Sequence, residues 1–257
     1  MKHSDKSKPE GQEIHWEFLY SAQFKWLKET RSYLYRMVRI ASHKRILEVG
    51  CSTALVTEEL SKKLDASVIG LDKNYNILHR TKNRNKNLKL VCGDVYQLPF
   101  KKNIFDTVIT QFFLLWLTEP INALSKIKET IKSNGWFIAA GEPDYGGRID
   151  FPDSVDYASY ISKNLKTEGA DPFIGRKLEY IFQKVNLQDI KWGLASIPFG
   201  LTLSEKNMKL SSNFLKNIAT VETTSELKKL LKVEKHYIQK KMRAYFTPVF
   251  YCIGRKK

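Results

Sequence analysis

The sequence has few cysteines and no cluster of typical metal ligands. Only Cys51, Cys92 and Cys252 occur among its 257 residues, and no two of them form a Cys-x-x-Cys pair. The five histidines do not gather around the cysteines, which argues against both a zinc site and a disulfide framework. We therefore expect three buried free thiols and no bound metal.

Long hydrophobic runs and a signal peptide are also missing. No apolar segment approaches the roughly 20 residues that a membrane span needs. The first residues, MKHSDKSKPEGQ, are polar and lack the apolar core of a signal peptide. These absences predict a cytoplasmic protein without a membrane span, in which residues 1–12 form a disordered leader.

Acidic residues are scarce relative to basic ones. The chain has 27 Asp and Glu against 43 Lys and Arg, a formal net charge of +16. Such an excess favours polyanionic partners, which include nucleic acid, anionic lipid and phosphorylated substrates. The lysines are spread along the chain instead of being gathered in one arm, so solvated surface positions are the favoured explanation. Nucleic acid stays a possible partner.

Strands and helices alternate through the first half of the chain. Short β-type runs are predicted at residues 45–49, 67–71, 88–92, 105–111 and 136–141, and helices between them at residues 57–64, 76–82 and 119–132. Ser133-Asn134-Gly135 is expected to end the last helix, with Gly135 as its left-handed cap. This alternation predicts right-handed crossovers and a parallel sheet, and therefore an α/β, Rossmann-like fold.

Helical segments flank this core on both sides. Apolar residues at helical spacing predict one long or two shorter helices in a cap at residues 13–43, where Trp16, Tyr20 and Phe24 either pack on the core or cover a ligand pocket. After residue 142 the alternation stops, and 142–148 reads as a loop. Further helices are expected at 152–166, 175–185 and 200–243, with strands at 189–197 and 245–253.

The lysines of the last helix are expected on its solvated side, and its apolar face is expected to be Leu227, Leu230, Leu231, Ile238 and Met242. We interpret residues 13–257 as a single domain. Its parts are the helical cap at 13–43, a ligand-binding core at 44–142, and helical elaborations on the substrate side at 143–187 and 200–243.

The stretch from Arg45 to Thr57 is the centre of this organisation. An apolar strand carrying Glu48 leads through Gly50 and small residues into a helix, which is how α/β sheets present a small polar ligand. Apolar neighbours predict that Glu48 is buried, and a buried carboxylate requires a partner. A cationic ligand group and nearby backbone amides both satisfy that requirement.

Three consecutive predicted strands end in acidic residues, namely Glu48, Asp72 and Asp94. The carboxyl ends of parallel strands lie along one edge of the sheet, where ligands of open α/β sheets bind. Asp72 follows Gly50 at a spacing suited to the two hydroxyls of a ribose, and Asp94 can accept from an exocyclic amine such as that of adenine. The set predicts a nucleoside site.

A phosphate cradle is absent from the same loop. A Gly-x-Gly-x-x-Gly loop would require glycine five positions after Gly50, where this chain has Leu55, and Glu48 close by would repel phosphate. A cationic nucleoside fits better. S-adenosylmethionine is such a ligand, since it carries a ribose, an adenine, an ammonium and a sulfonium.

These motifs resemble those of class I S-adenosylmethionine-dependent methyltransferases. Residues 47–54 (LEVGCSTA) are similar to the first motif, 68–72 (VIGLD) to the second, and 93–100 (GDVYQLPF) with 105–106 to the third. Residues 131–136 resemble the turn into strand five. Residues 171–178 and 250–257 are similar, more loosely, to the group that includes ubiquinone and menaquinone C-methyltransferases. The resemblance implies a seven-stranded, mostly parallel sheet whose last strand is antiparallel.

The resemblance also implies roles for individual residues. It places Glu48 near the methionyl amine, the loop under the ligand, Asp72 on the ribose hydroxyls, and Asp94 with Val95 on the adenine. The complete cofactor-binding set that we predict is Glu48, Gly50, Cys51, Ser52, Asp72, Lys73, Asp94, Val95 and Gln111. Ser52 and Ala54 replace the second and third glycines of the first motif, so we expect weaker or slightly shifted binding.

Acceptor-side residues are expected after strands four and five. Glu142 is the first candidate for substrate contact or general base, and Tyr145 the second, although pairing of Glu142 with Arg148 is an equal alternative. The substrate-side candidates are Tyr20, Phe112, Phe113, Asp144 and Arg148. For Phe112 and Phe113, packing in the core is the favoured explanation.

Methyl transfer from a sulfonium is an in-line displacement that requires alignment and exclusion of water. The segment Thr110-Gln111-Phe112-Phe113 lacks the Asn/Asp-Pro-Pro-aromatic motif of nucleobase amine methylation, and neither Cys51 nor Cys92 is placed for carbon methylation. We therefore expect a small-molecule acceptor. A tRNA or rRNA methyltransferase, suggested by the charge, and a non-catalytic subunit with this fold, suggested by the altered glycine loop, are the alternatives.

Overall fold

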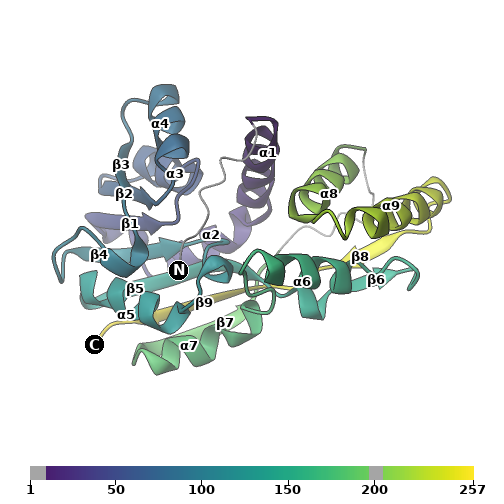
Figure 1. The fold of residues 1–257 in the computed structure, drawn as a ribbon. Coiled ribbons are helices and arrows are strands. Elements are labelled where there is room, and N and C mark those ends of the chain that lie inside the picture. The colour runs from purple at the N-terminus through teal and green to yellow at the C-terminus, as the bar shows by residue number, and fades with distance from the viewer. Residues whose placement is uncertain (1–9, 197–204) are drawn as a thin grey trace.

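A mixed seven-stranded sheet forms the centre of the molecule (Figure 1). The computed structural model describes residues 10–196 and 205–257. The strand order is β3-β2-β1-β4-β5-β9-β7, in which β9 runs antiparallel to both of its neighbours. The strands are β1 (Arg45–Val49), β2 (Ser67–Asp72), β3 (Lys89–Cys92), β4 (Phe105–Thr110), β5 (Ile131–Pro143), β7 (Gln188–Leu194) and β9 (Val249–Arg255). The predicted fold, with its antiparallel last strand, is confirmed.

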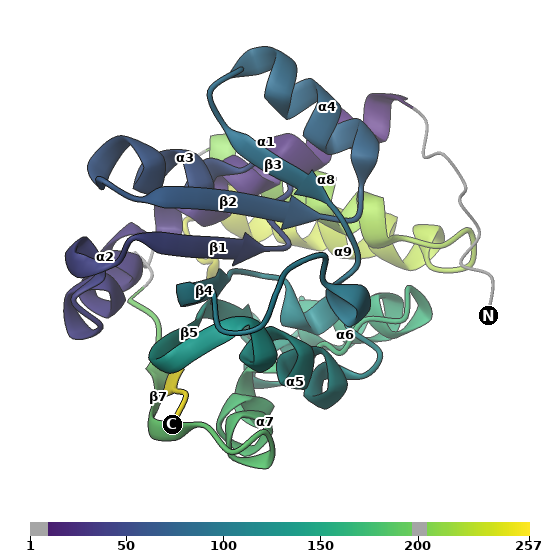
Figure 2. The same cartoon turned by 90° about the vertical axis from the view of Figure 1, so that its left-hand side faces the viewer.

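Helices cover both faces of this sheet (Figure 2). Alternate strand residues point to opposite faces, so Ile46 of β1 belongs to the buried cluster that α2 (Lys28–Met37) and α3 (Leu55–Lys63) cover, whereas Leu47 belongs to the cluster on the other face, to which α5 (Pro120–Thr130) and α7 (Leu178–Lys184) contribute. The two buried clusters are built in this way across the sheet. Helix α4 (Tyr75–Arg84) connects β2 to β3.

A second layer of helices extends the sheet beyond its carboxyl edge. Helix α1 (Glu10–Trp26) packs against α8 (Glu205–Ile218), and α8 in turn against α6 (Tyr157–Thr167) and α9 (Thr224–Gln239). A small antiparallel sheet of β6 (Ile149–Phe151) and β8 (Ala244–Phe246) borders them. Short 3-10 turns complete the chain: η1 (Ile40–Ser42), η2 (Val95–Gln97), η3 (Leu114–Trp116), η4 (Tyr145–Gly147) and η5 (Gly175–Lys177).

Several predicted boundaries are wrong. Residues 10–12 belong to α1 instead of a leader, while residues 1–9 and 200–204 lie outside the described residues. Helix α5 ends at Thr130, and Asn134, not Gly135, takes the left-handed conformation, because residues 131–135 already belong to β5.

Other corrections concern the second half of the chain and single residues. Residues 152–156 precede α6 instead of forming its first turn, and the loop predicted at 142–148 contains η4 and leads into β6. Met242 lies beyond α9 and is exposed, and Cys92 is an exposed thiol because β3 is an edge strand. The N-terminal cap consists of two helices, one of the two arrangements expected.

None of the helices within residues 10–196 and 205–257 is long and apolar enough to cross a membrane.

Candidate functional site

The loop after β1 has an unusual backbone. Gly50, Ser52 and Ala54 all have positive φ angles of 74°, 47° and 56°, so alternate residues lie in the left-handed region. The amides of Gly50 and Cys51 donate to the carbonyl of Leu71 at 2.8 and 3.0 Å, which ties the loop to the end of β2. The loop therefore keeps the backbone expected of glycines at 52 and 54, even though neither residue is glycine.

Glu48 is buried beneath this loop and bonds to the helix that follows it. Its Oε2 accepts hydrogen bonds from the Thr57 amide at 2.7 Å and from the Thr57 hydroxyl. Burial raises the pKa of Glu48 to about 7, against the opposing effect of the Thr57 hydrogen bonds and Arg31. A backbone amide, one of the two partners suggested by the sequence, therefore bonds to Glu48. The other suggested partner, a cationic ligand group, would stabilise the ionised carboxylate further.

Asp72 lies at the carboxyl end of β2 and faces the same loop. Its Oδ2 accepts from the Ser52 amide at 2.8 Å, and its Oδ1 accepts from the Asn74 amide at 2.9 Å. The carboxylate is half-buried and has about four lone-pair positions, so these two bonds leave acceptor capacity for a diol. Its neighbour Lys73 is exposed.

Asp94 and Val95 follow β3 along the same edge. The Asp94 carboxylate is exposed and accepts a hydrogen bond from the Tyr96 amide at 2.9 Å. This bond caps the start of η2. Val95 is buried in the core next to it. Glu48, Asp72 and Asp94 therefore occupy the ends of three adjacent strands in the predicted order, β1, β2 and β3.

Glu142 lies at the end of β5, fully buried. Its Oε1 accepts from the amides of Phe113 and Leu114 at 2.9 and 3.0 Å, and its Oε2 accepts from the Leu115 amide at 3.3 Å. Burial raises the pKa of Glu142 to about 7 against these three bonds. The carboxylate thus fixes the start of η3, and the alternative pairing with Arg148 is wrong.

The two phenylalanines after β4 differ in their placement. Phe112 has a φ of 49° and donates its amide to the Gly141 carbonyl at 2.8 Å. The ring of Phe113 lies against Gly50, where an added Cβ would come within 2.1 Å of the ring. Both rings pack on the core cluster, as the favoured explanation held. Gly50 is needed for this close contact as well as for its φ.

Arg31 of α2 is a buried charge next to this loop. Its Nε bonds to Glu59 Oε2 at 2.9 Å, and its Nη1 bonds to the Phe24 carbonyl at 2.6 Å and to Gln111 Oε1 at 3.1 Å. Its Nη2 is buried without a hydrogen-bond partner. Sequence reasoning missed it, although a charge on the apolar stripe of Leu27, Leu34 and Val38 was a visible signal.

Aromatic side chains gather on the acceptor side, from elements far apart in the sequence. Trp16 of α1 stacks on Tyr20 at 6.1 Å and meets Trp116 and Phe214 edge-on at 6.3 Å. Phe214 of α8 stacks on Tyr145 at 6.1 Å. Tyr20 and Tyr145 were predicted, whereas Trp116 and Phe214 were not. Burial raises the pKa of Tyr145 to about 12, so its phenol is protonated at neutral pH.

The two remaining substrate-side candidates carry structural contacts. Asp144 is buried, caps η4 through the amides of Gly146 and Gly147, and forms an ion pair with Arg176. Arg148 forms a two-bonded pair with Asp150, at 2.8 and 2.9 Å, on β6. Their contact with an acceptor stays a prediction.

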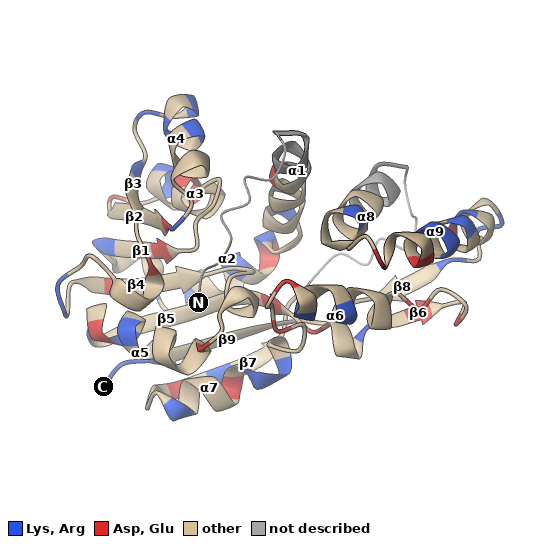
Figure 3. Ribbon diagram, viewed as in Figure 1, with Lys and Arg blue, Asp and Glu red and all other residues tan. Residues whose placement is uncertain are grey.

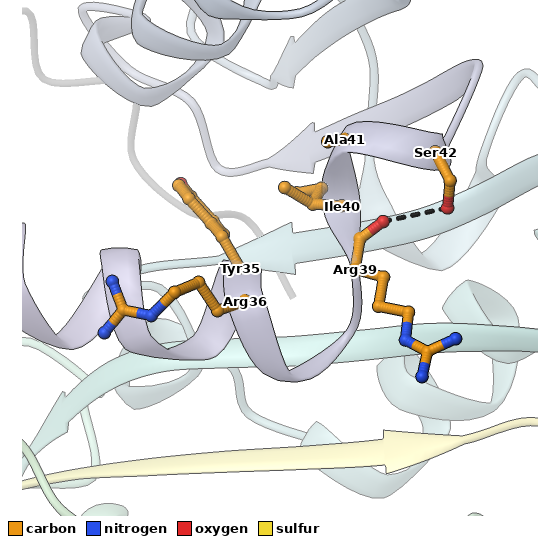
Figure 4. A pocket seen from close by; sticks show the side chains of 6 residues that line it. All are labelled: Tyr35, Arg36, Arg39, Ile40, Ala41 and Ser42. Atoms are coloured by element: carbon orange, nitrogen blue, oxygen red, sulfur yellow. Dashed lines mark hydrogen bonds between the residues drawn. The ribbon is translucent and has the colours of Figure 1, made fainter.

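A shallow apolar hollow lies elsewhere, between α2 and η1 (Figure 4). Tyr35, Ile40 and Ala41 line it, while Arg36 and Arg39 extend away from each other at its rim. It is next to the segment that leads into β1, at the opposite end of that strand from Gly50. It is therefore separate from the site at the carboxyl edge.

The residues at the carboxyl edge fit a cationic nucleoside. The Ser52 hydroxyl is buried without a partner, Asp72 retains acceptor capacity, and Glu48 supplies a buried carboxyl group that a cationic ligand group would keep ionised. No group of three or more His, Cys, Asp and Glu side chains within the described part of the chain could hold a metal ion.

Comparison with known proteins agrees with this geometry. Residues 47–139 match the family model described as a methyltransferase domain. An uncharacterized methyltransferase of Schizosaccharomyces pombe is 24% identical over 182 residues, covering 63% of this chain and 65% of its own. A demethylmenaquinone methyltransferase of Staphylococcus carnosus is 35% identical over 118 residues, covering 44% of this chain and 48% of its own.

Solved structures show the same fold. Phosphoethanolamine N-methyltransferase 2 of Haemonchus contortus, in complex with phosphomonomethylethanolamine and S-adenosylhomocysteine, superimposes with a TM-score of 0.65 at 15% identity, covering 98% of this chain and 59% of that one. The fold is the one found in class I S-adenosylmethionine-dependent methyltransferases, and residues 47–139 match a methyltransferase domain. This chain is similar to these methyltransferases over part of its length, and it spans 65% or less of the two curated relatives described above.

Proposed function

We propose that this protein transfers a methyl group from S-adenosylmethionine to a small-molecule acceptor by in-line displacement. The observation that carries the proposal is the edge formed by Glu48, Asp72 and Asp94 around a loop with three left-handed residues. This edge offers, in one row, a carboxylate that can accept from a diol, a carboxylate that can accept from an amine, and a buried carboxyl group that a cation would keep ionised. A cationic nucleoside requires all three.

In this proposal each residue has a defined task when the cofactor is bound. Asp72 accepts from the ribose hydroxyls, with Lys73 beside it, and Asp94 with Val95 borders the adenine. Glu48 is near the methionyl amine, with Gly50, Cys51 and Ser52 under the ligand. Gln111 is held at that end of the site by Arg31.

On the acceptor side, the side chains serve mainly to position and enclose the methyl acceptor, and acid–base chemistry is secondary. A base is needed only if the acceptor must lose a proton. Glu142 is our first candidate for that role, and Tyr145 the second. Because Glu142 is bonded to three amides, its first effect is to hold Phe113 and η3 in place. The aromatic group of Trp16, Trp116 and Phe214 supports an acceptor with apolar or cationic character.

Calorimetry tests the cofactor part of the proposal. We expect the wild-type chain to bind S-adenosylmethionine and S-adenosylhomocysteine, and Asp72→Ala to weaken both by at least tenfold, since two hydrogen bonds to a charged acceptor are lost. Asp65→Ala, which removes an exposed carboxylate paired with Lys44, is the matched control. Absence of binding by the wild type at millimolar ligand would refute the assignment.

A turnover assay then tests methyl transfer itself. Formation of S-adenosylhomocysteine would be followed with two acceptor classes, a reduced quinone and a phosphorylated amino alcohol, as suggested by the relatives. Binding without turnover on any acceptor would favour the alternative of a non-catalytic subunit with this fold.

The net charge of +16 favours a second candidate, a tRNA or rRNA methyltransferase. That candidate predicts sequence-selective RNA binding and RNA-dependent formation of S-adenosylhomocysteine. A cytoplasmic location remains a prediction under either candidate.

A further inference from the structure

One face of the small β6–β8 sheet exposes large apolar side chains. Ile149 and Phe151 of β6 are 65% and 52% exposed, and Met242, just before β8, is 48% exposed. Ile149 pairs with Phe246 and Phe151 with Ala244, so Ile149 and Phe151 share one face of the sheet, and Met242 lies two residues before Ala244 in the chain. We call Ile149, Phe151 and Met242 the β6–β8 patch.

The opposite face of the same sheet is polar and buried, which fixes the orientation of the patch. Asp150 and Arg243 form a buried ion pair there, and Arg243 also bonds to Glu234 of α9 at 3.1 Å. Tyr245, which pairs with Asp150, lies under the Arg148 and Arg243 guanidinium groups, at 4.7 and 5.3 Å. Because these charges hold the inner face, the apolar side chains cannot turn inward.

Basic side chains border the patch. Lys240 and Lys241 directly precede Met242 and are exposed. Figure 3 shows basic residues along α9 and at its junction with β8, and the exposed lysines of that helix are Lys228, Lys229, Lys232 and Lys235. The exposed carboxylates close in sequence to these residues are Glu222 and Glu226 around the start of α9, and Asp153 and Asp156 beyond β6. The balance at this end of the molecule is therefore positive.

We propose that the β6–β8 patch with Lys240 and Lys241 docks the protein on an anionic lipid bilayer. Exposed apolar side chains flanked by lysines are the combination that binds the interface of a membrane, because the former enter the acyl boundary and the latter attract acidic headgroups. Docking is peripheral and inserts no helix. The inference does not depend on methyl transfer, since it concerns a surface away from the cofactor edge.

RNA is the competing polyanion, and the patch chemistry favours lipid. Single-stranded RNA is held by aromatic rings that stack on bases, next to basic side chains. Two of the three patch residues, Ile149 and Met242, are aliphatic and offer no stacking surface. Aliphatic side chains are, however, well suited to contact acyl chains.

Vesicle co-sedimentation tests the proposal. The full chain would be mixed with vesicles of phosphatidylcholine alone, or with one third phosphatidylserine. We expect binding to the anionic vesicles only. Ile149→Ser with Phe151→Ser, and separately Lys240→Gln with Lys241→Gln, should each reduce that binding at least tenfold, since each lysine near an anionic surface contributes about fivefold.

Two control pairs separate this surface from bulk properties. Lys86→Gln with Lys101→Gln removes the same charge from exposed positions elsewhere, and Ile121→Ser with Tyr180→Ser removes exposed apolar groups from α5 and α7. Both should leave vesicle binding within twofold of wild type, and thermal unfolding should show that all variants fold.

Four outcomes would overturn the proposal. They are no binding to anionic vesicles, equal binding to neutral ones, undiminished binding by the patch variants, and equal loss in the lysine control. RNA binding at this surface in place of vesicle binding is an instance of the first outcome.

Discussion

Ser52 and Ala54 hold a backbone conformation that disfavours residues with a Cβ. Their φ angles of 47° and 56° lie in the left-handed region, where a non-glycine residue costs roughly 1–2 kcal/mol. The Ser52 hydroxyl is also buried without a hydrogen-bond partner. The loop is nevertheless fixed from outside, since the Ser52 amide bonds to Asp72 and Ala54 directly precedes α3. Strain of this kind is typical of ligand-binding loops.

We expect Ser52→Gly to stabilise the protein. Relief of the left-handed strain exceeds the entropic cost of a glycine, so the free energy of unfolding should rise by about 0.5–1 kcal/mol. Urea denaturation measures it. Ser61→Gly, on the exposed side of α3, is the matched control and should lower stability by about 0.5–1 kcal/mol. Destabilisation by both substitutions would show that Ser52 is not strained.

Glu48 and Glu142 are buried carboxyl groups whose pKa is raised to about 7 from an ordinary 4.5. Between pH 4.5 and about pH 7, each carboxyl group stays protonated in the folded state and is ionised in the unfolded state. The unfolded state therefore binds fewer protons, and the free energy of unfolding falls as pH rises, by up to about 1.4 kcal/mol per pH unit for each group.

Glu142→Gln is expected to remove one of these two contributions. The free energy of unfolding of the variant should fall less than that of wild type between about pH 5 and 7. This range lies between the ordinary pKa of 4.5 and the raised pKa of about 7. Urea denaturation at several pH values would be compared with Glu168→Gln, which removes an exposed carboxylate. Parallel profiles for Glu142→Gln and wild type would contradict the raised pKa.

At the scale of elements, buried charges attach the outer helices to the small sheet. Arg243 bonds to Asp150 of β6 and to Glu234 of α9, and Tyr157 of α6 donates to Glu234 at 2.8 Å. These groups come from three elements and are all nearly inaccessible to solvent. The position of α9 thus depends on a polar network as well as on its apolar face.

Arg243→Ala should lower the free energy of unfolding by about 3–5 kcal/mol, because it leaves Asp150 and Glu234 buried without their cation. The matched control is Arg255→Ala, which breaks the more exposed pair with Asp189 and should cost about 1 kcal/mol or less. Chemical denaturation of both variants compares them. Equal effects would mean that the network is hydrated and contributes little.

Local sequence patterns predicted the elements whose contacts are local. The strands that end at Glu48, Asp72 and Asp94 are short apolar runs followed by turns, and their order along one edge follows from right-handed crossovers. The pairing of β6 with β8 joins residues 149–151 to 244–246 and has no local signal. The same is true of the contact between Trp16 and Phe214, which only the packing of α1 on α8 creates.

At the scale of the whole molecule, the positive charge is spread over many elements instead of being concentrated on one. Basic residues occur on most elements in Figure 3, and many of them pair with neighbouring carboxylates. The distribution agrees with the preference for solvated lysines over a single nucleic-acid arm. Composition alone could not decide this point, because it contains no information on which charges are paired.

This distribution predicts weak RNA binding without sequence preference. We expect that a short single-stranded RNA binds at low salt and is released by about 0.2 M salt, since counterion release dominates such binding. Lys228→Gln with Lys229→Gln and the pair Lys86→Gln with Lys101→Gln should weaken it equally, because each removes two exposed charges. Fluorescence anisotropy across a salt series measures both. Selective loss in the α9 pair, together with a preferred RNA sequence that resists salt, would instead identify RNA as the acceptor and move the proposed function to the RNA methyltransferases.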